Sequence, residues 1–253
     1  MEDKLDIYTI EDEIAHLQNL GTFKKPKLLM HACCAPCSTY CVDYLYPYFD
    51  ITLYYYNPNI MPDEEWQKRA AEFDKLIAKY PEVKLIIPDQ STNEFLDLVK
   101  GYEKCPEGGD RCAICFNHRL NKTAHEATNG FDFFTTTLTV SPHKNAELIN
   151  SIGRQAGMLT GTKYLDSNFK KKNGYLKSIQ LCAELGIYTH LLDVVEKLLG
   201  QLVDTLGHIQ SAILSQSLNY CFVQVGNRSL AVGAVIFHNL INVCINSFSF
   251  NSP

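Results

Sequence analysis

The feature that most restricts the fold of this chain is a regular alternation of short apolar runs with longer helix-forming segments. The apolar and β-branched runs predict strands over residues 27–32, 51–56, 83–87 and 131–136. Helices are predicted between them over about residues 36–46, 62–79 and 91–99, and around residues 115–120. Because alternating strands and helices form parallel sheets covered on both faces, we predict an α/β fold with a mostly parallel sheet flanked by helices. Ligands bind such sheets at the carboxyl ends of the strands, where we expect the turn after Ala32.

Composition divides the chain into three parts. Its 253 residues are enough for one large domain, and residues 25–190 carry the alternating pattern. Residues 1–24 precede this domain as an N-terminal extension. Charged residues make up 20% of the whole chain, but the 56 residues beyond Lys197 contain only two charged side chains. We therefore expect residues 191–253 to form a divergent, charge-poor tail, an atypical C-terminal extension of the α/β domain.

Two segments bear on where the protein is found. Residues 1–5 include acids where a secretory signal would carry basic residues, so we expect no export signal and a cytoplasmic protein. In the tail, residues 230–245 are apolar but interrupted by His238, Asn239 and Asn242. This stretch is shorter than the roughly 20 residues that a membrane span requires, and we expect no membrane partner.

Ten cysteines in a reducing compartment indicate metal binding, redox catalysis or burial rather than disulfides. Three of them, Cys33, Cys34 and Cys37, lie between a predicted strand and a predicted helix. The start of a helix presents free N–H groups and a positive dipole end, which favour the thiolate that binds metals. Adjacent side chains point to opposite faces of a strand, so both can face one site only where the chain turns.

A second pair, Cys112 and Cys115, follows Gly108 and Gly109 at the start of another predicted helix. Two thiols three residues apart can bind one ion or one edge of a cluster, and the glycines let the backbone approach closely. Because both groups of cysteines lie at turns that lead into helices, the pattern predicts a shared thiolate site. Such a site suits structural zinc or an iron-sulfur cluster, and ligand softness does not separate the two.

Charge gives no overall indication of a nucleic-acid partner, because the formal net charge is −5. Any anionic partner must be held by a local patch. Two lysine clusters are candidates: Lys24, Lys25 and Lys27 in one, and Lys170, Lys171, Lys172 and Lys177 in the other. Charge alone does not distinguish either cluster from an ordinary solvated surface.

Five segments together form a more specific pattern. They are residues 31–37 (His-Ala-Cys-Cys-Ala-Pro-Cys), 56–60 (Tyr-Asn-Pro-Asn-Ile), 109–120, 134–142 and 166–179. In this order they resemble the motifs of QueH-type epoxyqueuosine reductases, over about residues 25–188. The resemblance implies a Rossmann-like (HUP-type) fold and an oxidoreductase. Such an enzyme reduces epoxyqueuosine at the wobble position of tRNA to queuosine, the last step of queuosine biosynthesis.

The resemblance also implies the cofactors and their ligands. It implies a [4Fe-4S] cluster held by Cys33, Cys34, Cys112 and Cys115, with a second, mononuclear metal ion beside it, iron or zinc, and no cobalamin. A cluster supplies electrons singly, and an adjacent metal ion acts as a Lewis acid on the oxygen that leaves the epoxide.

Four further residues near the thiols each have two interpretations. Asp89 and Asp110 are weak candidates for catalysis or for ligands of the second metal ion, and otherwise are surface or capping residues. Cys37 is either a fifth thiol of the site or a buried helix residue. His31 either donates a hydrogen bond to a thiolate or is a hydrogen-bonded histidine of the core.

The implied partners are a tRNA that carries epoxyqueuosine in its anticodon and an unidentified electron donor. Arg111 and Arg119 lie close in sequence to the cluster ligands, where they would hold tRNA phosphate or form ordinary helix ion pairs. Lys170, Lys171 and Lys172 would contact phosphates of the anticodon stem. Such contacts are independent of base sequence and sensitive to salt.

The chain departs from the family after Tyr188. The family continues with arginine, glutamine, asparagine and tyrosine and then with Cys-Gly-Cys, a pair taken to be a redox-active disulfide. Here Thr189 and the charge-poor tail follow, with a weak match at residues 219–221. An insertion or unrelated sequence would explain the difference. Full activity therefore depends on a supply of electrons that this resemblance does not identify.

Three other functions fit parts of the pattern. A thioredoxin-like thiol oxidoreductase would use Cys34 and Cys37 as its redox pair and would contain no iron. A zinc-stapled RNA-binding module would use the thiols without catalysis. A nucleotide-binding relative of tRNA-thiolating enzymes would need a glycine-rich phosphate loop after the first strand. This chain has thiols there, which disfavours the use of ATP.

Overall fold

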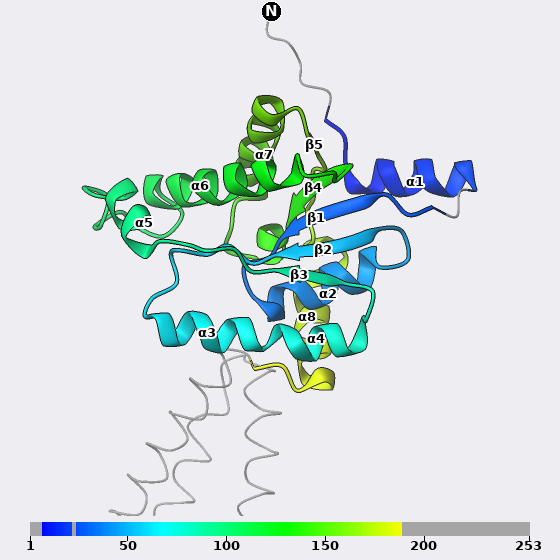
Figure 1. The fold of residues 1–253 in the computed structure, drawn as a ribbon, viewed down its shortest axis with the longest axis horizontal. Helices are drawn as coiled ribbons and strands as arrows, with labels where there is room; N and C mark the ends of the chain where they lie inside the picture. Colours follow the sequence, from blue (N-terminus) through cyan, green and yellow to red (C-terminus); the bar gives the residue numbers. More distant parts are fainter. Residues whose placement is uncertain (1–6, 22–23, 189–253) are drawn as a thin grey trace, which may run out of the picture. The chain divides into compact units, whose positions relative to one another are not determined.

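A computed structural model describes residues 7–21 and 24–188 of the chain. In this part the predicted alternation is confirmed, and the strands form one five-stranded sheet (Figure 1). The strands are β1 Lys27–His31, β2 Asp50–Tyr54, β3 Lys84–Ile86, β4 Phe133–Thr136 and β5 Lys163–Tyr164. Every neighbouring pair is parallel, in the order β3-β2-β1-β4-β5. The predicted α/β fold with a parallel sheet flanked by helices is therefore confirmed.

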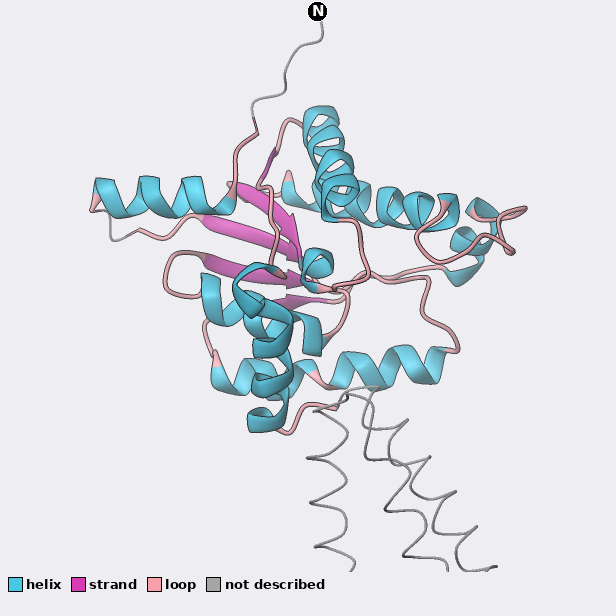
Figure 2. Cartoon of the chain, turned by 180° about the vertical axis from the view of Figure 1, so that it is seen from behind, coloured by secondary structure: helices cyan, strands magenta, loops and turns pink. Residues whose placement is uncertain are grey.

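Helices cover both faces of the sheet (Figures 1 and 2). They are α1 Ile10–Leu20, α2 Ala35–Leu45, α3 Asp63–Ala71, α4 Phe73–Lys79, α5 Thr92–Leu98, α6 Asp110–Ala127, α7 Ala146–Thr160 and α8 Gly174–Leu185. On one face α2 packs against α4 and α8, and on the other α6 packs against α7, β1 and β4. The single helix predicted over residues 62–79 is in fact two helices, α3 and α4, which meet at Glu72.

The side chains of β1 show why the sheet must be covered twice. Leu28 and Met30 point into the larger core, on the side of α2, whereas Leu29 points into a second core on the side of α6 and α7. All three are fully buried. Because successive side chains of a strand point to opposite faces, a strand that is buried on both faces has a continuous run of apolar residues.

The strand order creates a switch point between β1 and β4. From β1 the chain crosses through α2 to β2 on one side, and from β4 it crosses through α7 to β5 on the other. The two strands end level with each other, since His31 pairs with Thr136 in the register. The turn after Ala32 therefore lies at the carboxyl edge of the sheet, as predicted, beside the residues that follow β4.

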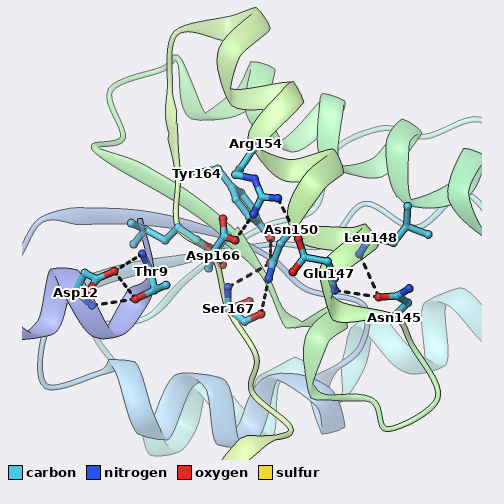
Figure 3. A network of polar contacts seen from close by, with 12 residues as sticks. Thr9, Asp12, Asn145, Glu147, Leu148, Asn150, Arg154, Tyr164, Asp166 and Ser167 are labelled. Carbon is cyan, nitrogen blue, oxygen red and sulfur yellow. Dashed lines mark hydrogen bonds and ion pairs between the residues drawn. The ribbon is translucent and has the colours of Figure 1, made fainter. Parts of the chain in front are cut away.

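The segment that follows β5 is held by a polar network (Figure 3). Arg154 of α7 donates to the carboxylate of Asp166, whose backbone also pairs with the chain just before α1. The amide of Asn150 accepts from the hydroxyl of Tyr164 at 3.0 Å and donates to the carbonyl of Ser167 at 3.0 Å. These bonds fix the start of the motif at residues 166–179 in the fold.

The two ends of the chain differ in what the structure describes. The predicted N-terminal extension contains α1, whose residues Ile10 and Ile14 are buried in the larger core. The predicted tail over residues 191–253, with its apolar stretch and its weak match to the family, lies outside the described residues. Within residues 7–21 and 24–188, no helix is both long enough and apolar enough to cross a membrane.

Gly174, the first residue of α8, allows that helix to pack closely on α2. A β-carbon at Gly174 would lie 1.7 Å from the carbonyl oxygen of Phe169 and 2.5 Å from the ring of Tyr40. Although alanine normally favours a helix over glycine, we expect Gly174→Ala to lower the free energy of unfolding. The expected loss is about 1–3 kcal/mol, typical of an overpacked core, and chemical denaturation measures it.

Gln180→Ala is the matched control, because Gln180 is an exposed residue of the same helix. Its free energy of unfolding should stay within about 0.5 kcal/mol of the wild-type value. If Gly174→Ala had the same free energy of unfolding as this control, that result would contradict the close packing of α8 on α2.

Candidate metal centre

Three cysteine side chains converge in the turn between β1 and α2. Cys34 is the last extended residue before α2, with φ −171° and ψ 164°, and Cys37 lies in the first turn of that helix. This change of backbone conformation brings the Sγ atoms of Cys33, Cys34 and Cys37 within 4.8 Å of one another. The Sγ atoms of Cys33 and Cys34 are 3.9 Å apart. Among the described residues, no other three cysteine, histidine or acidic side chains come together in this way.

The position of Cys37 favours one of its two interpretations. Its side chain is partly exposed and belongs to the thiol group, which fits a fifth thiol of the site. Cys41, one turn later in α2, is the buried helix cysteine, and its thiol donates to the carbonyl of Cys37 at 3.3 Å.

The three thiols influence one another's protonation. Hydrogen bonds from Cys34 and Cys37 lower the pKa of Cys33 well below that of a free thiol, although burial opposes them. The charge of Lys144 and the hydroxyl of Thr137 add to the lowering of this pKa. The interaction with Cys33 raises the pKa of both Cys34 and Cys37. The turn thus favours one thiolate beside two thiols, and a bound metal ion would displace the remaining protons.

The residues that follow β4 form hydrogen bonds with the turn that carries the three thiols. The backbone N–H of Cys33 donates to the hydroxyl oxygen of Thr137 at 3.2 Å, and that hydroxyl donates to the Sγ of Cys33 at 3.4 Å. Thr137 begins a short 3-10 helix, Thr137–Val140, directly after β4. Sequence reasoning placed Thr137 in a family motif without a role, and its position at the end of a strand was the available signal.

His31 is a hydrogen-bonded histidine of the core. It is fully buried, and its Nε2 donates to the carbonyl of Tyr56 at 3.2 Å. With the single proton of the neutral ring on Nε2, its Nδ1 accepts from the hydroxyl of Thr136 at 3.0 Å, and the oxygen of that hydroxyl accepts from the N–H of Leu138. Burial, with help from the charge of Arg119, lowers the pKa of His31 to about 3. The ring is therefore neutral, and both of its nitrogens are engaged within the fold.

Cys112 and Cys115 lie in the first two turns of α6. Cys112 packs with Cys33 against the same apolar cluster, and its Sγ accepts from the backbone N–H of Gly108 at 3.3 Å. Cys115 is buried and packs against Phe95 of α5. Neither thiol belongs to the group formed by the turn after β1. The four-thiol set of Cys33, Cys34, Cys112 and Cys115 stays a prediction.

The two acidic candidates lie outside the thiol group. Asp89 is exposed in the loop after β3, and Asp110 is the exposed first residue of α6. The neighbour of Asp89 has a clearer structural role. The side-chain oxygen of Gln90 accepts from the backbone N–H of Asn57 at 2.8 Å, and its amide donates to the carbonyl of Asn57 at 3.3 Å.

Arg119 is buried, which does not favour the predicted contact with tRNA phosphate. Only 4% of it is exposed. Its Nη1 donates to the side-chain oxygen of Asn57 at 3.0 Å, and its Nε donates to the carbonyl of Cys115 at 3.2 Å. A guanidinium committed to these bonds inside the fold is not available to an RNA backbone.

The other predicted RNA contacts lie nearer the surface. Arg111 is partly exposed in the first turn of α6, and Lys171 and Lys172 are exposed. Lys170 is partly buried, and its Nζ donates to the carbonyl of Lys144 at 2.8 Å. The backbone N–H of Lys170 also donates to the carbonyl of Thr139 at 3.2 Å, in the 3-10 helix whose first residue, Thr137, is bonded to Cys33. Lys144 itself was not predicted as a site residue.

Comparison with known proteins agrees with the five motifs. The family model described as epoxyqueuosine reductase QueH matches residues 28–190. The epoxyqueuosine reductase QueH of Streptococcus pyogenes serotype M1 is 45% identical over 170 residues, which cover 65% of this chain and 67% of that protein. The protein of the same name from Thermotoga maritima is 37% identical over 168 residues, covering 64% of this chain and 84% of that one.

Among solved structures, the U34-tRNA thiolase NcsA from Methanococcus maripaludis with its [4Fe-4S] cluster is similar at a TM-score of 0.42. Its sequence identity is 12%, over 82% of this chain and 83% of that chain. A similarity this low carries no conclusion about function. The family model and the sequence relatives do carry one, because the model matches most of the chain. The chain belongs to the QueH family of epoxyqueuosine reductases.

Proposed function

We propose that this chain is an epoxyqueuosine reductase, an oxidoreductase that acts on tRNA carrying epoxyqueuosine. The observation that carries the proposal is the convergence of three thiols at the carboxyl end of β1, in a member of the QueH family. The switch point of an α/β sheet is where such folds bind their ligands. The reaction breaks both C–O bonds of the epoxide, consumes two electrons and two protons, and yields the alkene of queuosine and water.

The donor set suits an iron-sulfur cluster, because soft thiolates are its usual ligands. We assign Cys33, Cys34, Cys112 and Cys115 to a [4Fe-4S] cluster. Cys37 is then left for a second metal ion, iron or zinc, and the proposal requires no cobalamin. When bound, the cluster would supply electrons one at a time, and the ion would polarise the epoxide oxygen as a Lewis acid.

Residues around the thiols orient Cys33 and influence its protonation. Thr137 orients Cys33 by bonding both its backbone N–H and its Sγ. Lys144 favours the thiolate form of Cys33 through its positive charge. His31 is neutral and has both ring nitrogens engaged, so we assign it no role in proton transfer.

Besides the nucleotide-binding relative, which the thiols after the first strand already disfavour, the other two alternative functions are also less well supported. A thioredoxin-like enzyme uses two thiols as an isolated redox pair. Here Cys33 is a third thiol in the same group, with its Sγ 3.9 Å from that of Cys34, so Cys34 and Cys37 are not an isolated pair. A zinc-stapled RNA-binding module would need no redox chemistry, whereas the QueH relatives are named as reductases.

We further propose that the exposed lysines beside the thiol turn hold the tRNA backbone, and that the chain acts in the cytoplasm. Lys171 and Lys172 are exposed, and Lys170 is bonded to the loop that carries Lys144. The electron donor is a separate partner of unidentified nature. The residues where the family carries Cys-Gly-Cys lie outside the described part of this chain.

Metal analysis tests the cofactor assignment. After anaerobic purification and reconstitution, we expect the wild-type chain to contain iron and acid-labile sulfide. Cys112→Ser should lose most of both, because a hydroxyl is a poor ligand for a soft metal centre. Cys105→Ser is the control, since Cys105 lies in the loop before α6 and is not one of the four assigned ligands, and should keep wild-type content. Zinc without iron or sulfide in the wild-type chain would refute the cluster.

Restoration of queuosine tests the activity. In a bacterial host that lacks its own epoxyqueuosine reductase, this gene should convert epoxyqueuosine in tRNA to queuosine, and Cys112→Ser should not. Mass spectrometry of tRNA nucleosides measures both. Purified enzyme with dithionite as reductant provides a second arm that does not depend on the cellular electron donor. Unreduced epoxyqueuosine in both arms would contradict the proposal.

Salt dependence tests the RNA contact. Replacing Lys171 and Lys172 with alanine should weaken binding to a tRNA carrying epoxyqueuosine. The plot of log affinity against log salt should become less steep by about one for each phosphate that a lysine no longer neutralises. Lys84→Ala is the control, because Lys84 lies at the amino end of β3, at the opposite edge of the sheet from the thiols. An unchanged slope for the double variant would rule out this contact.

A further inference from the structure

Arg119 is a buried cation without an acidic partner among the described residues. It lies one turn after Cys115 on α6, with 4% of its surface exposed. None of the ion pairs within the described part of the chain includes it. Burying a charge costs several kcal/mol unless it is paired, and arginine does not escape by losing its proton. A buried arginine held only by neutral groups therefore requires a source of negative charge nearby.

The groups that hold Arg119 are neutral and connect the two cysteine-bearing segments. Its guanidinium donates to the carbonyl of Cys115 at 3.2 Å and to the side-chain oxygen of Asn57 at 3.0 Å. The amide nitrogen of Asn57 in turn donates to the carbonyl of Ala32, the residue before Cys33, at 2.8 Å. One side of the guanidinium also faces the ring of Phe116, with 5.6 Å to its centroid.

Asn57 is fixed in this orientation. It is fully buried at the end of the segment that follows β2, and Gln90 engages both its backbone N–H and its carbonyl. Because the Asn57 amide must donate to Ala32, its oxygen is the group that faces Arg119. The chain of bonds from Ala32 through Asn57 and Arg119 to Cys115 therefore places one positive charge between the backbones of the two thiol segments.

An iron-sulfur cluster with four thiolate ligands carries net negative charge, and reduction makes it more negative. A fixed cation beside such a centre stabilises the reduced form, because charge and hydrogen bonding around a cluster set its potential. We propose that Arg119 is a positioning residue that raises the reduction potential of the cluster by holding a positive charge beside it. This rests on the proposed function, since it requires the cluster.

Redox titration of the reconstituted full chain, followed by electron paramagnetic resonance, tests this role. Arg119→Gln keeps a donor at the position but removes the charge, and its midpoint potential should be more negative than that of the wild type. Arg119→Lys keeps the charge and should stay closer to the wild type. Lys122→Gln is the matched control, because it removes a positive charge from an exposed position on the same helix and should leave the potential unchanged.

The outcomes separate this inference from the proposed function. A wild-type chain without iron and sulfide would contradict the proposed function itself. A loaded Arg119→Gln variant with the wild-type potential would overturn only the role of Arg119, as would an Arg119→Lys variant shifted as far as Arg119→Gln.

If Arg119→Gln does not fold, Asn57→Asp provides a second test. It keeps the arginine but places a carboxylate against it, which should also make the potential more negative. A wild-type potential in a loaded Asn57→Asp chain would likewise overturn the inference.

Discussion

The parallel pairing of β1 with both β2 and β4 is the constraint on which the rest of the structure depends. β1 is central and buried on both faces, so its register with its neighbours is fixed by Leu28 and Met30 on one side and Leu29 on the other. His31 ends level with the last residues of both neighbouring strands. The chain must turn at that edge, and the turn carries Cys33 and its neighbouring thiols to the start of α2. The loop after β4 arrives at the same point because the strand order reverses there.

Positive charge also lies near the thiols at this carboxyl edge of the sheet. The thiols are crowded, so that only Cys33 among them has a lowered pKa, and Lys144 adds positive charge beside it. Arg119 brings another cation, which is buried and has no carboxylate partner among the described residues. Thiolates bound to a soft metal centre would supply the negative charge that these cations lack. The acids that sequence reasoning considered, Asp89 and Asp110, are both exposed and do not join the thiols.

Much of this arrangement could be predicted from the sequence. The apolar run of β1 and the cysteines after it are local signals, and they were sufficient to predict the parallel sheet and a thiol turn at its carboxyl edge. The two-residue strand β5 was missed because it is too short to show a period. The burial of Arg119 and its bond to Asn57 join residues 62 positions apart, so no local pattern could predict them. The position of Thr137 at the end of a strand was a local signal, but its bond to Cys33 joins residues 104 positions apart and could not be predicted in the same way.

Anomalous scattering from an anaerobically grown crystal tests the central claim most directly. Data collected on both sides of the iron absorption edge locate iron atoms without any assumption about activity. We predict strong iron peaks beside the Sγ atoms of Cys33, Cys34, Cys112 and Cys115. Peaks that appear only at the zinc edge, or iron peaks remote from these four thiols, would contradict the assignment of an iron-sulfur cluster to them.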